Sequence, residues 1–142
     1  MDAQTTGNRT VRLDYDLAFP PEKVWRALTQ ADLLARWLMP NDLVAKVGHR
    51  FRFQTDPAPG FDGVIHCHVL EVLPPKRLQL TWVGGPLDTV VTWMLTPTAA
   101  GTRLQVTQEG FPPDNAWAYE GAQYGWHKFL GQQLPHFLEG ME

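Results

Sequence analysis

Two histidines, His66 and His68, are the side chains whose spacing most directly suggests chemistry. One residue separates them in a segment that we expect to be a strand, so both imidazoles point to the same side of a sheet. Two imidazoles on one face could begin a zinc site, but such a site needs three or four ligands, and no spacing brings a further histidine close. We therefore expect no metal and predict that they line a cavity as polar groups among apolar walls, with the choice between the two left open.

Gln108 is a second polar candidate for a binding site. It follows Leu104 and Val106 at alternate positions, which places all three on the inward face of a strand. A buried amide must find a hydrogen-bond partner. That partner is either a bound ligand or a neighbouring side chain such as a tyrosine or histidine, and the sequence leaves both open.

Catalysis of a cyclase or hydrolase type would need a titratable pair in the same cavity. The sequence offers His66 or His68 together with Tyr119 or Glu109 for that role. Cys67 is expected on the opposite side of its strand from the two histidines, as a small buried apolar residue and not as a nucleophile. The sequence contains no GxSxG, no phosphate-binding glycine loop and no HExxH motif. We assign no catalytic residue, and whether the protein is an enzyme stays open.

Aromatic residues are the most unusual feature of the composition, with six Trp, seven Phe and three Tyr. Each one alone is expected to pack in the core, but together they exceed what a domain of this size needs. Because indole and phenol groups also seek hydrogen-bond partners, we expect some to face a cavity. Trp117 and Tyr119 stand at the predicted start of a helix beside residues 111–113, where they are candidates for a gate. The aromatic candidates for the cavity wall are Trp37, Phe53, Trp82, Trp93, Trp117, Tyr119 and Trp126.

Length and composition predict one globular domain, over residues 10–139. The chain has 142 residues, of which 44% are apolar and 19% charged, and such a chain buries about 68% of its unfolded surface without metal or disulfide. The formal net charge is −3 without any basic stretch, so we expect neither nucleic acid nor an anionic membrane as a partner.

The single cysteine excludes an intramolecular disulfide and fits a cytoplasmic setting. Residues 1–9 are predicted to be a flexible segment without a signal peptide, and no stretch is apolar enough to span a membrane.

Hydrophobic periodicity predicts an α+β fold. Alternation with a period of two predicts strands at residues 10–18, 50–55, 63–73, 77–83, 89–96 and 102–109. Short helices are predicted at residues 21–29 and 31–38. From Asp114, the expected N-cap, an apolar stripe predicts a long C-terminal helix whose last turns are bent or loosened by Pro135. Gly121 and Gly125 share one face of this helix and are expected to let it approach the sheet closely. Short turns between strands imply antiparallel pairing, and a twisted sheet must curl around the long helix.

Four local patterns give the chain a family resemblance. Two of them are AFPPEKVWRALT at residues 18–29 and LARWLMP at residues 34–40. The other two are VLEVLPPKRL at residues 69–78 with Thr81 and Trp82, and Gly125-Trp126 followed by leucines at 130, 134 and 138. In this order they resemble the START-like, or SRPBCC, superfamily, and within it the homologues of the heat-shock chaperone ATPase activator. The resemblance covers about residues 10–139.

This resemblance implies a helix-grip fold, in which a curved antiparallel sheet wraps around a long C-terminal helix and two short helices follow the first strand. It also implies a cavity between the long helix and the sheet, but no cofactor and no shared catalytic set, because the superfamily includes lipid carriers, hormone receptors, aromatic cyclases and chaperone co-factors. We therefore predict binding of a small hydrophobic or aromatic molecule.

Two alternatives stay open beside ligand binding. One is a cyclase- or hydrolase-type enzyme that uses the same cavity. The other is an interaction module that modulates a chaperone ATPase in the stress response. The eukaryotic activators place a chaperone-binding domain before this one, whereas the present sequence begins almost at the first strand, which weakens the expectation of a chaperone partner. A homodimer is also considered, because symmetric dimers are the commonest assemblies of such domains.

Overall fold

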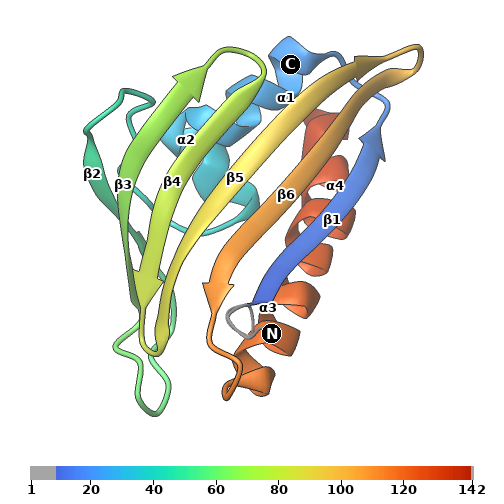
Figure 1. Ribbon diagram of the computed structural model, residues 1–142. Coiled ribbons are helices and arrows are strands. Elements are labelled where there is room, and N and C mark those ends of the chain that lie inside the picture. Colours follow the sequence, from blue (N-terminus) through green and yellow to red (C-terminus); the bar gives the residue numbers. More distant parts are fainter. Residues whose placement is uncertain (1–8, 142) are drawn as a thin grey trace.

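The computed structural model describes residues 9–141, and in this part of the chain six strands form one antiparallel sheet (Figure 1). The strands are β1 (Arg9–Leu17), β2 (Arg50–Gln54), β3 (Val64–Leu73), β4 (Arg77–Gly84), β5 (Leu87–Thr98) and β6 (Gly101–Phe111). Their spatial order is β1-β6-β5-β4-β3-β2, so the first two strands of the chain lie at opposite edges. The segment 1–9, predicted to be flexible, lies outside the described residues except for its last residue.

Two short helices, α1 (Pro21–Thr29) and α2 (Ala31–Trp37), connect the two edge strands. Pro21 stands in the first turn of α1, where its missing N–H costs nothing, and Glu22 beside it favours the positive end of the helix dipole. The two helices are joined through the buried side chain of Trp37. Its indole N–H donates a hydrogen bond of 2.9 Å to the backbone carbonyl of Ala27.

The sheet has one apolar face because buried and exposed side chains alternate along its strands. The inward faces of β5 and β6 are those that the sequence predicts, and their buried side chains include Val91, Trp93, Leu95, Leu104, Val106 and Gln108. A register shift between Val69 and Glu71 marks a bulge in β3, and bulges bend the strand that carries them. Figure 1 shows that the sheet curves around the helices packed on this apolar face, which is its concave side.

The C-terminal helix consists of α3 (Ala116–Lys128), a π-helical turn η1 (Phe129–Gln133) and α4 (Leu134–Gly140). In the π turn the backbone N–H of Leu134 bonds to the carbonyl of Phe129. This wide turn directly precedes Pro135, whose ring would crowd the carbonyl four residues earlier in a regular helix. The loosening predicted at Pro135 takes this form.

The long helix covers the concave side of the sheet (Figure 1). Its first part, α3, packs against β1 and β6, and α4 packs against α1 and α2. The predicted helix-grip fold is confirmed, including the two short helices after the first strand. No helix within residues 9–141 is long and apolar enough to cross a membrane.

The start of α3 differs by one residue from the predicted one. Asn115, and not Asp114, is the N-cap, since its side-chain oxygen accepts the backbone N–H of Ala118 at 3.4 Å.

Replacing Asn115 with alanine is expected to lower the free energy of unfolding by about 1 kcal/mol, because the cap is lost. The control Asp114→Ala should change it by less than about 0.5 kcal/mol. Urea denaturation followed by circular dichroism measures both variants, and equal losses would contradict the assignment of the cap.

Candidate ligand-binding pocket

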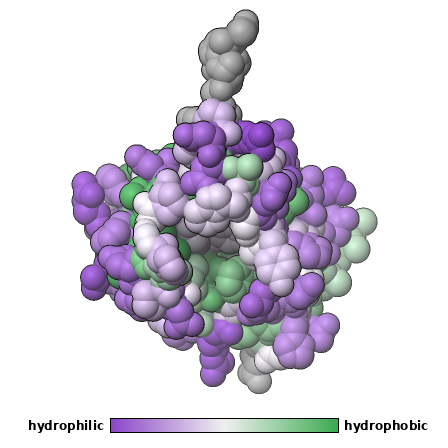
Figure 2. All heavy atoms as spheres, turned by 90° about the horizontal axis from the view of Figure 1, so that it is seen from below, coloured by the Kyte–Doolittle hydropathy of each residue, from purple (hydrophilic) through white to green (hydrophobic). Residues whose placement is uncertain are grey.

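A pocket of about 480 Å³ lies between α3 and the sheet, at the end of the molecule where the β4–β5 turn and the loop 55–63 meet. Figure 2 looks into this end and shows a hollow with a hydrophobic interior inside a hydrophilic border. Seventeen residues line the pocket, and none of them is ionisable. They are Leu38, Ala58, Pro59, Phe61, Ile65, Trp82, Gly84, Pro86, Leu87, Gln108, Trp117, Ala118, Gly121, Ala122, Gly125, Trp126 and Phe129.

Four of the six residues that α3 contributes to the lining are alanine or glycine, and Gly121 and Gly125 are the smallest of them. A Cβ atom added at either glycine would meet no other atom within 4 Å. The prediction that these glycines let the helix approach the sheet closely is therefore wrong, because they face open pocket space. Inside a helix, each glycine lowers the stability by about 0.5–1 kcal/mol relative to alanine. What they provide in return is volume in the pocket.

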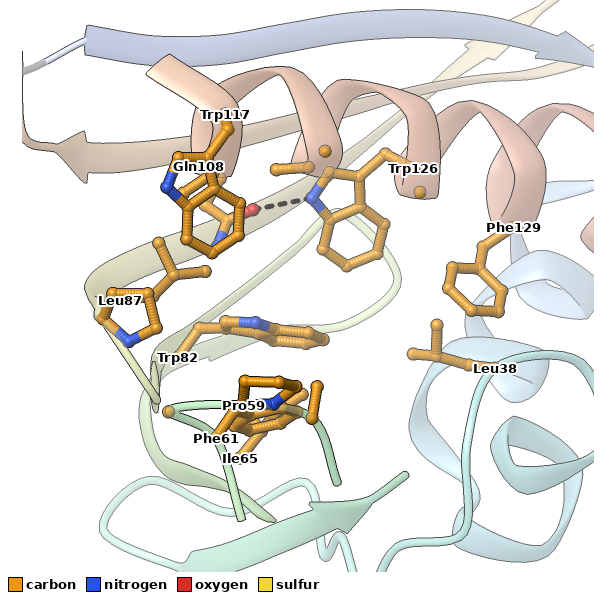
Figure 3. A pocket seen from close by; sticks show the side chains of 17 residues that line it. Leu38, Pro59, Phe61, Ile65, Trp82, Leu87, Gln108, Trp117, Trp126 and Phe129 are labelled. Atoms are coloured by element: carbon orange, nitrogen blue, oxygen red, sulfur yellow. Dashed lines mark hydrogen bonds between the residues drawn. The ribbon is translucent and has the colours of Figure 1, made fainter. Parts of the chain in front are cut away.

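Indole rings from opposite sides meet in the pocket, as Figure 3 shows. The ring of Trp82, from β4, lies 5.2 Å from that of Trp126, from α3, with an angle of 57° between the planes. Phe53 supports Trp82 from behind at 5.0 Å, and Trp93 stands edge-on to Trp126 at 6.1 Å. Phe53 and Trp93 are fully buried and lie outside the lining, so their role is to hold the two lining indoles in place.

A chain of hydrogen bonds fixes the position of Trp126. Its indole N–H donates to Oε1 of Gln108 at 2.8 Å, and Nε2 of Gln108 donates to Oγ1 of Thr89 at 2.9 Å (Figure 3). The hydroxyl of Thr89 in turn donates to the backbone carbonyl of Trp82 at 2.8 Å. Gln108 is only 1% exposed. The sequence left open whether Gln108 bonds to a ligand or to neighbouring side chains. In the structure it bonds to neighbouring side chains, and through them it links the two indoles.

The two histidines are placed differently from the prediction. His66 is exposed and His68 is half-buried, and neither lines the pocket, so the expectation that they do is wrong. The buried face of β3 carries Ile65, Cys67 and Val69, and the period of two turns the histidines to the outer face. Within residues 9–141, no three His, Cys, Asp or Glu side chains are grouped so that they could hold a metal ion.

Two aromatic candidates also lie away from the pocket. Trp37 packs in the core between α1 and α2, where its indole is already bonded to Ala27. Tyr119 turns toward β1, and its hydroxyl donates to the carbonyl of Thr10 at 3.5 Å. Tyr119 therefore does not gate the pocket. Trp117 does stand at the mouth, with 70% of its side chain exposed.

Comparison with known proteins decides the family. The family model described as "Activator of Hsp90 ATPase homolog 1-like protein" matches residues 18–139. The chain belongs to this family. The resemblance drawn from the four sequence patterns is thereby confirmed. No curated protein matches the chain.

Three solved structures are similar to this family member. Protein MLL2253 from Mesorhizobium loti is 44% identical, with a TM-score of 0.87, over 94% of this chain and 99% of that one. DynU16, from the dynemicin biosynthetic locus, is 28% identical with a TM-score of 0.77, over 92% of this chain and 47% of its own. Protein BH1534 from Bacillus halodurans is 26% identical with a TM-score of 0.79, over 92% and 96%.

Several lining residues of this family member were not among the predicted ones. Phe61 comes from a loop without periodicity, so no pattern pointed to it. It reaches the pocket because Gly84 and Gly85 leave room, since a Cβ atom on either would lie 3.1–3.3 Å from the Phe61 ring. Ile65 could have been found, because it shares the apolar phase of β3 with Cys67. Further lining side chains that were missed include Leu38, Leu87 and Phe129.

Cys67, the one cysteine of the chain, is expected to be unreactive in the folded protein. Burial raises the pKa of its thiol, and the negative charge of Asp42 raises it further. Because the thiolate is the reactive form, a thiol reagent such as DTNB should label the native protein at pH 8 far more slowly than the urea-unfolded chain. Rapid labelling of the native protein at the unfolded rate would contradict the burial of this side chain.

Proposed function

We propose that this protein binds a small hydrophobic or aromatic molecule in the pocket between α3 and the sheet, without chemical turnover. The observation that carries the proposal is the lining, which has seventeen residues and no ionisable side chain. The volume of about 480 Å³ falls in the usual range of small-molecule sites, about 300–1,000 Å³. Paired indoles offer flat faces to an aromatic ligand.

The lining also supports binding over the cyclase or hydrolase alternative. General acid–base catalysis needs a titratable group within hydrogen-bond reach of the substrate. His66, His68 and Glu109 lie on the outward faces of their strands, and Tyr119 bonds to β1. None of the titratable pairs that the catalytic hypothesis offered therefore lines the pocket. The polar groups that do reach it, an amide and indoles, do not exchange protons with substrates near neutral pH.

A chaperone-modulating role is the second candidate, because the family description names an activator of the Hsp90 ATPase. Such a role would depend on a surface outside the pocket. A pull-down with purified chaperone separates the two functions, since it should be insensitive to substitutions that fill the pocket. The pocket itself favours the ligand-binding function.

Titration with N-phenyl-1-naphthylamine, an uncharged probe at neutral pH, tests the proposal. Its fluorescence rises in apolar surroundings, and we expect saturable 1:1 binding with a Kd on the order of 1–100 μM. The same titration in urea, where the pocket is lost, is the control. A signal that does not saturate, or that appears only as the protein unfolds, would contradict the proposed function.

A further inference from the structure

The interior of the pocket contains a hydrogen-bond donor that the protein itself does not use. Trp82 is 7% exposed, and its indole N–H has no hydrogen bond to any described residue. The N–H of Trp93 is sealed in the core, whereas that of Trp82 is open to the pocket, and Figure 3 shows its nitrogen on the edge of the ring toward the open space. An indole N–H can only donate, so it requires an acceptor atom.

The contacts of Trp82 hold this donor in place. Its ring lies 5.0 Å from that of Phe53 and 5.2 Å from that of Trp126. Its backbone carbonyl accepts the hydroxyl of Thr89 at 2.8 Å. Because the ring is packed from two sides, its N–H stays directed into the pocket before any ligand arrives. A donor that is already in position loses little conformational freedom when it binds.

The other polar side chains of the lining are committed to partners or stand at the mouth. The amide of Gln108 is 1% exposed and bonds at both ends, to the N–H of Trp126 and to the hydroxyl of Thr89. Trp117 stands at the mouth with 70% of its side chain exposed. None of the lining residues is ionisable. Among the described residues, the pocket interior therefore presents the Trp82 N–H to a ligand and presents no charge.

We propose that the ligand is an uncharged hydrophobic or aromatic molecule that carries a hydrogen-bond acceptor, such as a carbonyl oxygen, and that the indole N–H of Trp82 binds this acceptor. The inference rests on the proposed function and adds the polar group that the ligand must have. A pure hydrocarbon in the pocket would exclude water from the N–H and offer no acceptor in its place, which lowers the affinity. An ionised group would be buried without a partner, which is costly.

Two probes of nearly the same shape test the inference. They are 1-acetylnaphthalene, which has a carbonyl acceptor, and 1-isopropenylnaphthalene, in which a methylene group replaces the carbonyl oxygen. Displacement of N-phenyl-1-naphthylamine measures the affinity of each probe for the wild-type protein and for Trp82→Phe. The preference for the acetyl probe should fall about fivefold in the variant, because the donor is lost while both probes lose the same ring contacts. An unchanged preference would overturn the inference.

A third probe, 1-naphthoate, tests whether the ligand must be uncharged. It has acceptor oxygens on the same aromatic body, but it is ionised at pH 7.5. We expect it to bind more weakly than 1-acetylnaphthalene, because the lining has no cation to pair with it. Tighter binding of naphthoate would contradict the requirement for an uncharged ligand.

The matched control variant is Phe129→Leu, which removes an aromatic ring from the same lining without removing a hydrogen-bond donor. It should weaken the acetyl and isopropenyl probes alike and leave the preference between them at the wild-type value. A fall in preference equal to that in Trp82→Phe would show that the N–H has no special role. Failure of N-phenyl-1-naphthylamine and of all the naphthalene probes to bind the wild-type protein would instead contradict the proposed function, so the two failures are distinguishable.

Proton NMR of the wild-type protein gives a second readout, which does not depend on the stability of a variant. The indole N–H signal of Trp82 can be assigned through its proximity to the rings of Phe53 and Trp126. With 1-acetylnaphthalene bound, this signal should lie at lower field than with 1-isopropenylnaphthalene, because a hydrogen bond to the carbonyl deshields the proton. The same position with both probes would mean that the N–H does not bind the acceptor.

Discussion

Replacing Gly125 with leucine is expected to abolish binding of a hydrophobic probe while the protein stays folded. The glycine lines the pocket, and an added Cβ atom meets nothing within 4 Å, so a leucine side chain starts in open space and extends into the pocket. Leucine also favours the helix by close to 1 kcal/mol over glycine. We expect probe affinity to fall by at least about tenfold, since the filled volume is lost to the ligand, while the midpoint of urea denaturation rises.

Two control variants make this test specific. Gly125→Ala should raise stability by about 0.5–1 kcal/mol and keep most of the affinity, because one methyl group removes little volume. Gly140→Leu adds the same side chain in α4, at a glycine that is equally open and outside this pocket. Unchanged probe binding in Gly125→Leu would mean that the ligand binds elsewhere.

Replacing Gln108 with alanine is expected to lower the free energy of unfolding by about 2–4 kcal/mol. The substitution leaves the indole N–H of Trp126 without its acceptor and the hydroxyl of Thr89 without its donor, and it opens a cavity at a side chain that is 1% exposed. Probe binding should weaken as well, because Trp126 is no longer held against Trp82. Chemical denaturation and probe titration measure the two effects.

The matched control for this variant is Gln105→Ala on the same strand. Gln105 points outward and donates to Asp14 at 2.9 Å, an exposed interaction that contributes about 0.5 kcal/mol or less. If the two alanine variants lost equal stability, the buried hydrogen-bond chain would not have the structural role assigned to it.

Much of the fold follows from sequence periodicity. The alternation in β5 and β6 correctly places Trp93 and Gln108 on the inward face, because a strand has only two faces and one is apolar. The helical stripe after residue 115 and the effect of Pro135 also follow from local rules. The predicted start of α3 is wrong by one residue, because Asp114 and Asn115 are both good N-cap residues and only the conformation of the backbone selects between them.

The pocket was less predictable than the fold. Of the predicted wall, Trp82, Gln108, Trp117 and Trp126 do line the pocket. His66 and His68 do not, although the apolar phase of their strand already assigned them to the outer face.

The role of the glycines and of Phe61 required tertiary structure. A glycine pair on a helix face is compatible both with close packing and with open space, and only the position of the sheet tells which one holds. Phe61 belongs to a loop whose path depends on Gly84 and Gly85 in another hairpin. Such contacts are long-range, so no local pattern contains them.

The central claim, that the pocket holds a small hydrophobic molecule, is tested most directly by native mass spectrometry of the purified protein before and after organic extraction. We expect a species heavier than the bare chain by the mass of one small molecule, which extraction removes and which Gly125→Leu never carries. The extracted molecule should be hydrophobic or aromatic and small enough for a pocket of about 480 Å³. A wild-type protein that shows only the bare chain mass, even after incubation with a hydrophobic extract of cells, would contradict the claim.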